Sequence, residues 1–208
     1  MTEHIDMIPL IGVITAAYLI GAIPFGLVMA RLFGLGDIRT IGSGNIGATN
    51  VLRTGHKPAA LLTLLLDSGK GLMIVVVIRL MGGNDIMLTA AAVASIFGHC
   101  YPVWLRFRGG KGVATGIGVF LGLDWLAGIL ICLLWLVVAV IFRLSSVSAL
   151  VSYLSAPALI GLTAYWRGDD MPFALIYGAG IMACLATWRH RSNISRVLAG
   201  KEPRIGRS

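Results

Sequence analysis

Three short stretches of the chain combine glycine, hydroxyl, amide and basic residues, and each could bind an anion. The first, Ile41 to Lys57, reads IGSGNIGATNVLRTGHK; the second, Gly98 to Gly116, reads GHCYPVWLRFRGGKGVATG; the third, Trp188 to Arg204, reads WRHRSNISRVLAGKEPR. We name them the first, second and third polar clusters. Glycines let backbone N–H groups converge on an anion, and lysine or arginine supplies the opposite charge. These residue types suit the binding of phosphate-like groups.

In the first cluster, Gly42, Gly44 and Gly47 form a G-x-G-x-x-G pattern. We disfavour a dinucleotide site, because that pattern has meaning only after a strand, and here an apolar stretch of helical length precedes it. The loop still suits a phosphate, since a helix beginning near Asn50 would point its positive end at the same anion. Arg53 could then make a two-pronged contact. The alternative is a flexible loop whose glycines serve close helix packing.

The second cluster contains RGGKGVAT, which differs from a Walker A loop because glycine follows the lysine and the upstream glycine is absent. Gly109, Gly110 and Lys111 nonetheless predict a backbone nest with a cation at the head of an apolar stretch. The arginines on either side of Phe107 serve equally well as interfacial anchors beside a tryptophan. In the third cluster, His190 and Asn193 are three residues apart and so would share a helix face.

The basic residues around the third cluster have a second interpretation. A basic tail after a final apolar stretch is also a signal of membrane topology. That alternative gives no reason for the asparagine, so we keep His190 and Asn193 as candidate site residues.

The composition indicates that helices crossing a membrane hold these three clusters in place. Of 208 residues, 57% are hydrophobic and 12% are charged, whereas about a quarter are charged in soluble domains. The apolar residues form long uncharged runs near the roughly 17–25 residues that a helix needs to cross a bilayer. We therefore predict an all-α integral membrane protein of one domain, residues 1–208, and no soluble class. The predicted spans are 7–30, 58–78, 86–105, 112–123, 125–142, 147–166 and 171–188.

The short stretch 112–123 is ambiguous, because it could cross the membrane or begin one long helix that ends at Phe142. If it crosses, giving seven spans, fourteen of the seventeen Lys and Arg residues lie on one face; if it does not, the split is eight and eight. Lys and Arg collect on the cytoplasmic side, so we predict seven transmembrane helices with the N-terminus outside and the C-terminus cytoplasmic. The fourteen are Arg31, Arg39, Arg53, Lys57, Arg106, Arg108, Lys111, Arg143, Arg189, Arg191, Arg196, Lys201, Arg204 and Arg207. The acids predicted outside are Glu3, Asp6, Asp85, Asp124, Asp169 and Asp170.

Asp67 and Lys70 are three residues apart inside the predicted span 58–78. Ionisable residues in a membrane either mark function or pair with one another. Because the spacing places both on one helix face, we expect a structural salt bridge. The three cysteines lie apart without C-x-x-C spacing, which predicts neither a disulfide framework nor a metal site.

Several known catalytic signatures are absent from the sequence. It contains no His-x4-Asp pair, no Gly-x-Ser-x-Gly elbow, no Cys–His signature and no His/Asp metal cluster. An acyltransferase built on these clusters would therefore need a substrate that is already activated. The main alternative is a transporter or exchanger of phosphate or a phosphorylated metabolite, since short helices and intramembrane charges also occur there. That class would place polar residues at the midplane and repeat them, and neither feature is evident. A regulatory or scaffold subunit is a third possibility.

In order and over nearly the whole chain, the three clusters resemble the three cytoplasmic motifs of the bacterial acyl-phosphate:glycerol-3-phosphate acyltransferases, often called PlsY. Ile46, where proline is also common, is a mild departure. The resemblance implies acyl transfer from acyl phosphate to the sn-1 hydroxyl of glycerol 3-phosphate. The products would be 1-acyl-glycerol 3-phosphate (lysophosphatidic acid) and phosphate, in the first step of phospholipid synthesis. It also implies a multi-pass protein of the bacterial inner membrane that works as a monomer among membrane lipids, with its active site facing the cytoplasm and without cofactor, metal or nucleic acid.

The resemblance also assigns site residues. The implied catalytic residues are Ser43, Arg53, Lys111, His190 and Asn193. The implied substrate-binding residues are Gly42, Gly44, Asn45, Thr49, Asn50, Gly109, Gly110, Ser146 and Ser148. Either Ser146 or Ser148 is expected to complete the site, and the resemblance does not choose between them. Whether His190 or a substrate phosphate accepts the hydroxyl proton also stays open.

Overall fold

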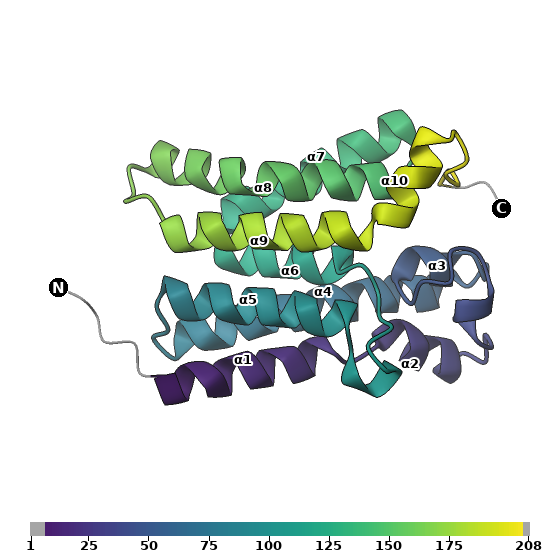
Figure 1. Ribbon diagram of the computed structural model, residues 1–208, viewed down its shortest axis with the longest axis horizontal. Coiled ribbons are helices and arrows are strands. Elements are labelled where there is room, and N and C mark those ends of the chain that lie inside the picture. Colours follow the sequence, from purple (N-terminus) through teal and green to yellow (C-terminus); the bar gives the residue numbers. More distant parts are fainter. Residues whose placement is uncertain (1–6, 206–208) are drawn as a thin grey trace.

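The computed structural model describes residues 7–205, and within that range the regular structure is entirely helical (Figure 1). The elements are α1 Met7–Gly21, α2 Phe25–Leu32, η1 Ile38–Thr40, α3 Ala48–Leu52, α4 Lys57–Leu80, α5 Asp85–Cys100, η2 Val103–Leu105, α6 Val113–Leu123, α7 Trp125–Phe142, α8 Ser145–Arg167, α9 Phe173–Arg189 and α10 Arg191–Leu198. Three charged residues used in the predicted topology, Glu3, Asp6 and Arg207, lie outside the described range.

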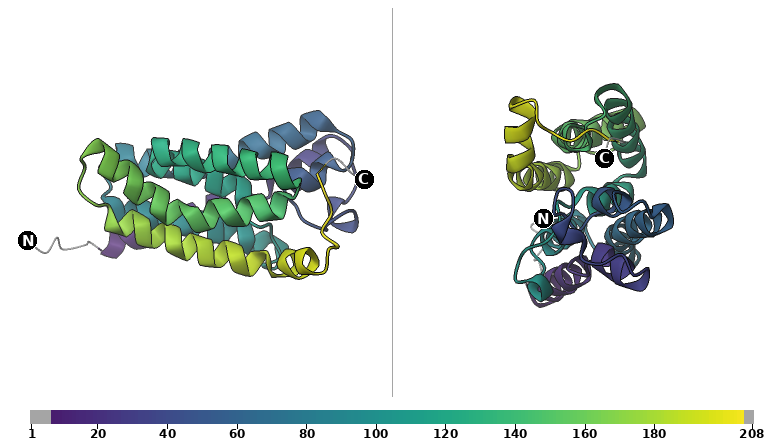
Figure 2. Two further views of the ribbon diagram at one scale, coloured as in Figure 1. Left: turned by 90° about the horizontal axis from the view of Figure 1, so that it is seen from above. Right: turned by 90° about the vertical axis from the view of Figure 1, so that its right-hand side faces the viewer.

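The long helices run back and forth between two ends of the molecule. Figure 1 shows α1 and then α4 to α9 in alternating directions, with α2, α3 and α10 at one end, and the view from above in Figure 2 agrees. Five segments are long and apolar enough to cross a membrane, while α6 and α9 are shorter apolar helices. The five are Pro9–Leu32, Lys57–Leu80, Asp85–Leu105, Trp125–Phe142 and Ser145–Arg167.

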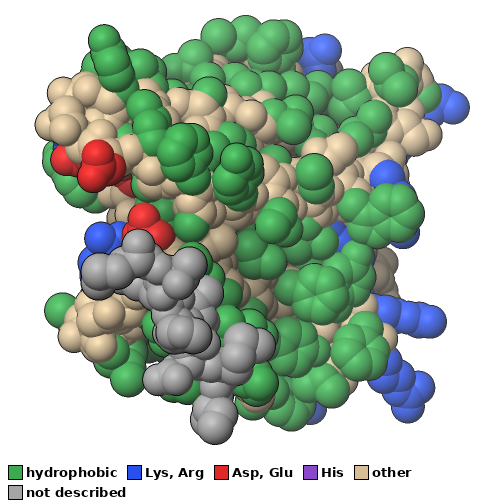
Figure 3. Space-filling view, turned by 60° about the vertical axis from the view of Figure 1, so that its left-hand side comes forward, with side chains coloured by type: hydrophobic (Ala, Val, Ile, Leu, Met, Phe, Trp, Pro, Cys, Tyr) green, Lys and Arg blue, Asp and Glu red, His purple; other side chains and the backbone are tan. Residues whose placement is uncertain are grey.

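The outer surface along the helices is apolar. Large side chains such as Leu80, Val140 and Tyr177 are 82%, 70% and 69% exposed, and hydrophobic side chains cover the flank seen in Figure 3. Soluble monomers rarely expose contiguous apolar patches larger than a few hundred Å². Most Lys and Arg side chains in that view lie at one end, and the Asp and Glu side chains lie at the other (Figure 3). This distribution fits a bundle surrounded by lipid, with polar material at its two ends.

Two predicted spans are interrupted. The stretch 7–30 forms two helices, because Pro24 lacks an N–H and the residue before a proline avoids the helical conformation. The α-helical part of 86–105 ends at Cys100, two residues before Pro102, and continues only as the short η2. Each interruption lies near the end that carries the polar clusters.

The chain reverses at Asp124, so α6 and α7 are separate antiparallel helices. The backbone of Asp124 is extended (φ −146°), and its carboxylate accepts hydrogen bonds from Leu126 N and Ala127 N, both at 3.0 Å. A carboxylate in this position caps the first turn of a helix. The alternative of one long helix through both segments is therefore wrong.

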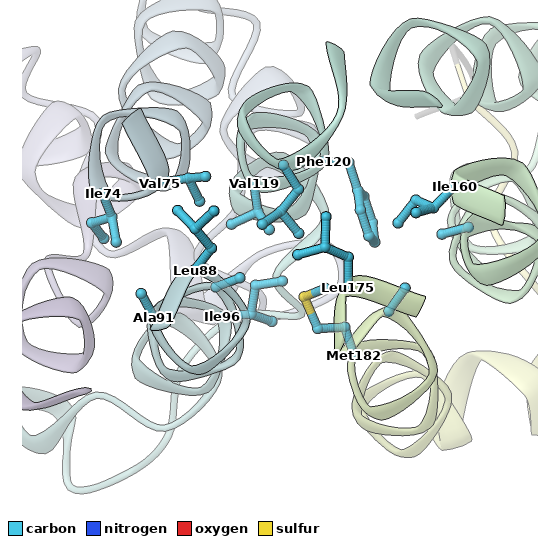
Figure 4. Packing of buried hydrophobic residues seen from close by; sticks show 14 of the residues in the cluster. Ile74, Val75, Leu88, Ala91, Ile96, Val119, Phe120, Ile160, Leu175 and Met182 are labelled. Carbon is cyan, nitrogen blue, oxygen red and sulfur yellow. The ribbon is translucent and has the colours of Figure 1, made fainter. Parts of the chain in front are cut away.

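Glycines allow α4 and α6 to pack closely at the centre of the bundle. A Cβ atom at Gly71 would overlap the Thr115 carbonyl oxygen, and one at Gly118 would overlap that of Ser68. Small residues at such contacts let transmembrane helices approach. Around them, Figure 4 shows apolar side chains of α4, α5, α6, α8 and α9 meeting in one core. Because α6 lies in this core, its first turn has a fixed position at the polar end.

Candidate active site

The third polar cluster is hydrogen-bonded to the second. Arg189, the last residue of α9, donates from Nε to the Gly110 carbonyl oxygen (3.0 Å) and from Nη2 to that of Gly109 (2.9 Å). The same guanidinium lies 4.9 Å from the centre of the Tyr101 ring, a distance suited to a cation–π contact. These contacts connect the end of α9 to the loop that precedes α6.

The two glycines of that loop lie directly on the end of α5. Gly109 N donates to the Cys100 carbonyl oxygen (3.2 Å), and Gly110 N donates to that of His99 (3.0 Å). A Cβ atom at either glycine would overlap atoms of this helix end. Sequence reasoning expected both amides to face an anion. Instead the protein itself uses them, and glycine is needed here for close packing.

Lys111 follows this loop and stands immediately before α6. The next residue, Gly112, has φ +79°, a conformation that glycine adopts without strain. Its carbonyl oxygen accepts a hydrogen bond from the buried Tyr153 hydroxyl (2.9 Å). The backbone on both sides of Lys111 is therefore held by neighbouring helices, which fixes the position from which its side chain extends.

Basic residues of the first and third clusters act electrostatically on Lys111 of the second. Burial lowers the pKa of the Lys111 ammonium to about 8; Glu202 opposes this shift, while Arg196, Arg189 and Arg53 add to it. Positive charges gathered at one partly buried place attract anions. Such a shift also indicates that a bound dianion would return the lysine to its ordinary, fully charged state.

In the first cluster, the side chain of Asn50 organises the loop and is itself buried. Its Nδ2 donates to the Ile38 carbonyl oxygen (2.6 Å), and its Oδ1 accepts from Ser43 N (3.1 Å), Ser43 Oγ (3.3 Å) and Arg53 Nη1 (3.3 Å). The Arg53 side chain lies over Gly42, where a Cβ atom would overlap it. Asn50 thus shapes the cluster, while Ser43 and Arg53 stay exposed to solvent.

The other predicted residues of the first cluster lie at its rim. Gly44 N donates to the Ile41 carbonyl oxygen (2.9 Å) in a tight turn, with Gly44 at φ +67°. Asn45 is half-buried, and Thr49 is exposed on α3, which begins at Ala48, two residues before the expected start. These side chains border the cluster without the contacts that define Asn50.

Glu202 connects the third cluster to the head of α8, a role that sequence reasoning missed. Its Oε1 accepts from Ser146 Oγ (2.7 Å) and Asn193 Nδ2 (2.6 Å), and its Oε2 accepts from Arg196 Nε (2.8 Å). Burial acts to raise the pKa of this carboxyl, but the three hydrogen bonds prevail and lower it. The available signal was that Glu202 is the single acid in an otherwise basic stretch.

The structure distinguishes between the two candidate serines. Ser146 donates to Glu202 within the cluster. Ser148 is fully buried and donates to the Leu144 carbonyl oxygen at the start of its own helix (3.0 Å), a local bond common for serine in helices. Of the two, only Ser146 joins the polar cluster.

Asn193 presents a free acceptor. A carboxylate can only accept, so the contact with Glu202 requires the Asn193 amide nitrogen to face it. Among the described residues 7–205, the buried Oδ1 on the other side has no hydrogen-bond partner. A buried polar atom of this kind is rare in folded proteins and indicates a missing partner.

His190 lies between α9 and α10, so it does not share a continuous helix face with Asn193. It is 1% exposed, and its Nδ1 is 2.8 Å from the Ala186 carbonyl oxygen. Because that oxygen only accepts, Nδ1 carries the proton and Nε2 is an acceptor. Burial lowers the pKa of His190 to about 4. The ring is therefore neutral near pH 7.

Comparison with known proteins identifies the family. The family model described as "Glycerol-3-phosphate acyltransferase" matches residues 11–200. The chain belongs to the glycerol-3-phosphate acyltransferase family. Curated members include the glycerol-3-phosphate acyltransferases of Jannaschia sp. (strain CCS1), 52% identical over 92% of this chain and 91% of the relative, and Dinoroseobacter shibae, 50% identical over 99% and 97%.

Solved structures of the family have the same fold. The glycerol 3-phosphate form of PlsY (YgiH), an integral membrane glycerol 3-phosphate acyltransferase, is 37% identical, with a TM-score of 0.86 over 95% of this chain and 96% of that one. Its lysophosphatidic acid form is 36% identical, with a TM-score of 0.84 over the same shares. The likeness establishes an all-helical integral membrane protein, as expected from the apolar stretches.

Proposed function

We propose that the protein transfers an acyl group from an acyl phosphate to the sn-1 hydroxyl of glycerol 3-phosphate. The products are 1-acyl-glycerol 3-phosphate and inorganic phosphate, and the reaction begins phospholipid synthesis. Membership of the acyltransferase family supports the acceptor. Acyl phosphate as the donor is what the resemblance of the three clusters to the PlsY motifs implies, and the cations that they offer for two phosphate groups support it.

The proposal includes a topology. Seven transmembrane helices, α1 with α2 and then α4 to α9, would cross the bacterial inner membrane, with the N-terminus outside and the C-terminus in the cytoplasm. The one-sided distribution of Lys and Arg supports this orientation. Glycerol 3-phosphate would enter from the cytoplasm, and the acyl donor would enter sideways from the inner leaflet. A single chain contains every proposed site residue, which is consistent with a working monomer.

The reaction needs positioning and charge stabilisation more than covalent catalysis. The hydroxyl oxygen of glycerol 3-phosphate attacks the carbonyl carbon, a new ester C–O bond forms, and the bond from that carbon to the phosphate oxygen breaks. Phosphate leaves with the electron pair. Lys111 and Arg53 bind the two phosphate groups and stabilise the one that departs. Ser43 and the free Oδ1 of Asn193 orient the carbonyl and the attacking hydroxyl.

We assign acceptance of the hydroxyl proton to a substrate phosphate. A histidine with a pKa of about 4 and its Nδ1–H bonded to Ala186 is a weak base near pH 7, because a general base works best when its pKa lies near the working pH. A phosphate monoester titrates near 6, much closer to the working pH than His190. His190 then contributes its neutral Nε2 as a hydrogen-bond acceptor.

One observation supports this function most strongly. Arg53 and Glu202 both act electrostatically on Lys111 at one end of the bundle, and Glu202 is hydrogen-bonded to Asn193. Purified protein, given labelled glycerol 3-phosphate and acyl phosphate in detergent, should form lysolipid and phosphate in equal amounts. Uptake of label into proteoliposomes without lysolipid would instead support a transporter. Lysolipid formed from acyl-CoA but not from acyl phosphate would refute the proposed donor.

The proton assignment has its own test. His190→Asn should lower kcat yet keep the acid limb of the pH profile near pH 6, because a substrate phosphate, with a pKa of about 6, sets that limb. If the acid limb disappears in this variant and the loss of activity equals that of Lys111→Ala, His190 is the base and the assignment is wrong.

A further inference from the structure

A buried ionic cluster lies directly beneath the second loop, which we define as residues 109–112. Lys70 Nζ donates to Asp67 Oδ1 (2.7 Å) and to the Ile23 carbonyl oxygen (2.8 Å), and it lies 3.1 Å from His99 Nδ1. The side chains of Lys70 and Asp67 are 2% exposed and that of His99 is 4% exposed. The cluster joins α4, α5 and the break between α1 and α2.

The contacts define the state of each group. An ammonium has three donors and no acceptor, and here the three donors meet three acceptors. With Lys70 as an ammonium, His99 Nδ1 is the acceptor of its third proton, and the same nitrogen lies 3.6 Å from Asp67 Oδ1. The contacts of Nδ1 with Lys70 and Asp67 orient the His99 ring.

The His99 ring packs directly against Gly110 of the second loop. A Cβ atom at Gly110 would overlap His99 Nε2, and the His99 carbonyl oxygen accepts from Gly110 N at 3.0 Å. From the opposite side, Arg189 donates to both glycine carbonyl oxygens. The loop is held between His99 and Arg189, and Lys111 is the next residue along it.

Stability alone gives little reason for such a cluster. Replacing a buried ion pair by apolar residues of similar size is often neutral or stabilising, since burying the charges costs about as much as their attraction returns. What an ionic cluster with fixed hydrogen bonds supplies is a defined position for its neighbours. Here the neighbour is the loop that carries Lys111.

We propose that Asp67, Lys70 and His99 are positioning residues for acyl transfer, which hold the second loop so that Lys111 faces the first and third clusters. This inference rests on the proposed role of Lys111 in binding phosphate. It goes beyond the salt bridge that the spacing of Asp67 and Lys70 predicts, because it assigns the pair an effect on the reaction.

A second ionic cluster, in which the acid is buried and the arginine is partly exposed, provides a control at the opposite end of the bundle. Arg167 donates to Asp124 at 3.1 and 2.8 Å, and Thr163 Oγ1 donates to the same carboxylate at 2.9 Å. This cluster joins the start of α7 to α8. It resembles the first in chemistry and burial of its acid, but it holds no part of the second loop.

The principal variant is the charge-neutral Asp67→Asn/Lys70→Met pair, which should fold because it leaves no unpaired buried charge. We expect its KM for glycerol 3-phosphate to rise, or its kcat to fall, by about ten- to a hundredfold per folded enzyme, the effect of displacing a catalytic group by about 1 Å. Asp124→Asn should lower the melting temperature and leave KM and kcat within about threefold. Folded protein is counted by size-exclusion chromatography and thermal melting.

Two further variants separate positioning from mere stability. His99→Asn keeps an acceptor near the position of Nδ1 and should stay within about threefold of the unaltered protein, while His99→Leu should show the large loss. Normal KM and kcat in folded Asp67→Asn/Lys70→Met and His99→Leu would overturn the inference, as would an equal kinetic loss in Asp124→Asn. Lys111→Ala runs in the same assay. If Lys111→Ala is fully active, the proposed function of the loop fails as well; if only Lys111→Ala loses activity, the positioning inference alone is wrong.

Discussion

Glu202→Gln tests the third cluster most sharply, because it changes one oxygen to nitrogen and keeps the shape. Glu202 accepts three hydrogen bonds, from Ser146, Asn193 and Arg196. An amide offers only one acceptor atom. If the introduced amide turns its oxygen to the serine and asparagine, its NH₂ faces the arginine and two donors meet. If it turns the other way, Asn193 must flip, and its free acceptor becomes a donor.

The size of the effect follows from these two alternatives. Either arrangement loses at least one hydrogen bond to a charged group, worth about 1.5–3 kcal/mol. Because each 1.4 kcal/mol is about tenfold in rate, kcat/KM for glycerol 3-phosphate should fall by about 10- to 150-fold. The flipped arrangement acts on the reacting hydroxyl, so the fall should appear mainly in kcat.

The assay is the initial rate of lysolipid formation in detergent, with folded protein measured by thermal melting. Asp37→Asn is the matched control, an acid-to-amide change at the same end. Asp37 pairs with Arg39 at 2.7 Å, but both side chains are about half exposed, and such surface pairs contribute roughly 0–1 kcal/mol. We expect its rate to change less than about threefold. Equal rates for Glu202→Gln and Asp37→Asn in folded protein would refute the role assigned to Glu202.

Other variants test the remaining parts of the site and fold. Ser146→Ala should lower kcat/KM by about tenfold through loss of a hydrogen bond to a carboxylate, whereas Ser148→Ala should change it less than about twofold; equal effects would contradict the distinction. The pKa of about 8 for Lys111 predicts that, above the titration of the substrate phosphate near pH 6, the KM for glycerol 3-phosphate stays flat up to about pH 8 and then rises as the ammonium loses its proton. A flat KM up to about pH 10, the ordinary lysine range, would disprove this. Gly118→Ala should destabilise the protein by about 1–3 kcal/mol, because the added methyl group overpacks α4 against α6. Gly69 faces open space, so Gly69→Ala should be neutral or stabilising. Melting curves in detergent compare the two variants.

Most of the fold could be predicted because a bilayer leaves few choices. Long uncharged runs must become helices that satisfy their own backbone hydrogen bonds, and the structure has helices at every predicted stretch. The helix break at Pro24 and the end of α5 before Pro102 could have been predicted from the sequence, because both prolines lack a backbone N–H. The reversal of the chain at Asp124 could not be predicted from hydropathy, because it depends on a carboxylate that caps α7.

The site was predictable where charge identified it, and less so where tertiary contacts decide a role. Few polar residues occur in so apolar a chain, so Arg53 and Lys111 were conspicuous. The use of the Gly109 and Gly110 amides depends on how α5 ends, which spacing does not reveal. Glu202 was missed because its importance comes from the chain turning back after α10 to reach the head of α8.

The most direct test of the central idea is the sidedness of the three polar clusters. With the native cysteines replaced, single cysteines at Lys57, Arg108, Arg191 and the control position Asp169 are treated with a membrane-impermeant maleimide in inverted and right-side-out vesicles. All four positions are exposed to solvent. The first three should react only in inverted vesicles, and Asp169 only in right-side-out ones. If any of the first three reacts from the outside, the clusters cannot share one phosphate-binding site and the proposed mechanism is wrong.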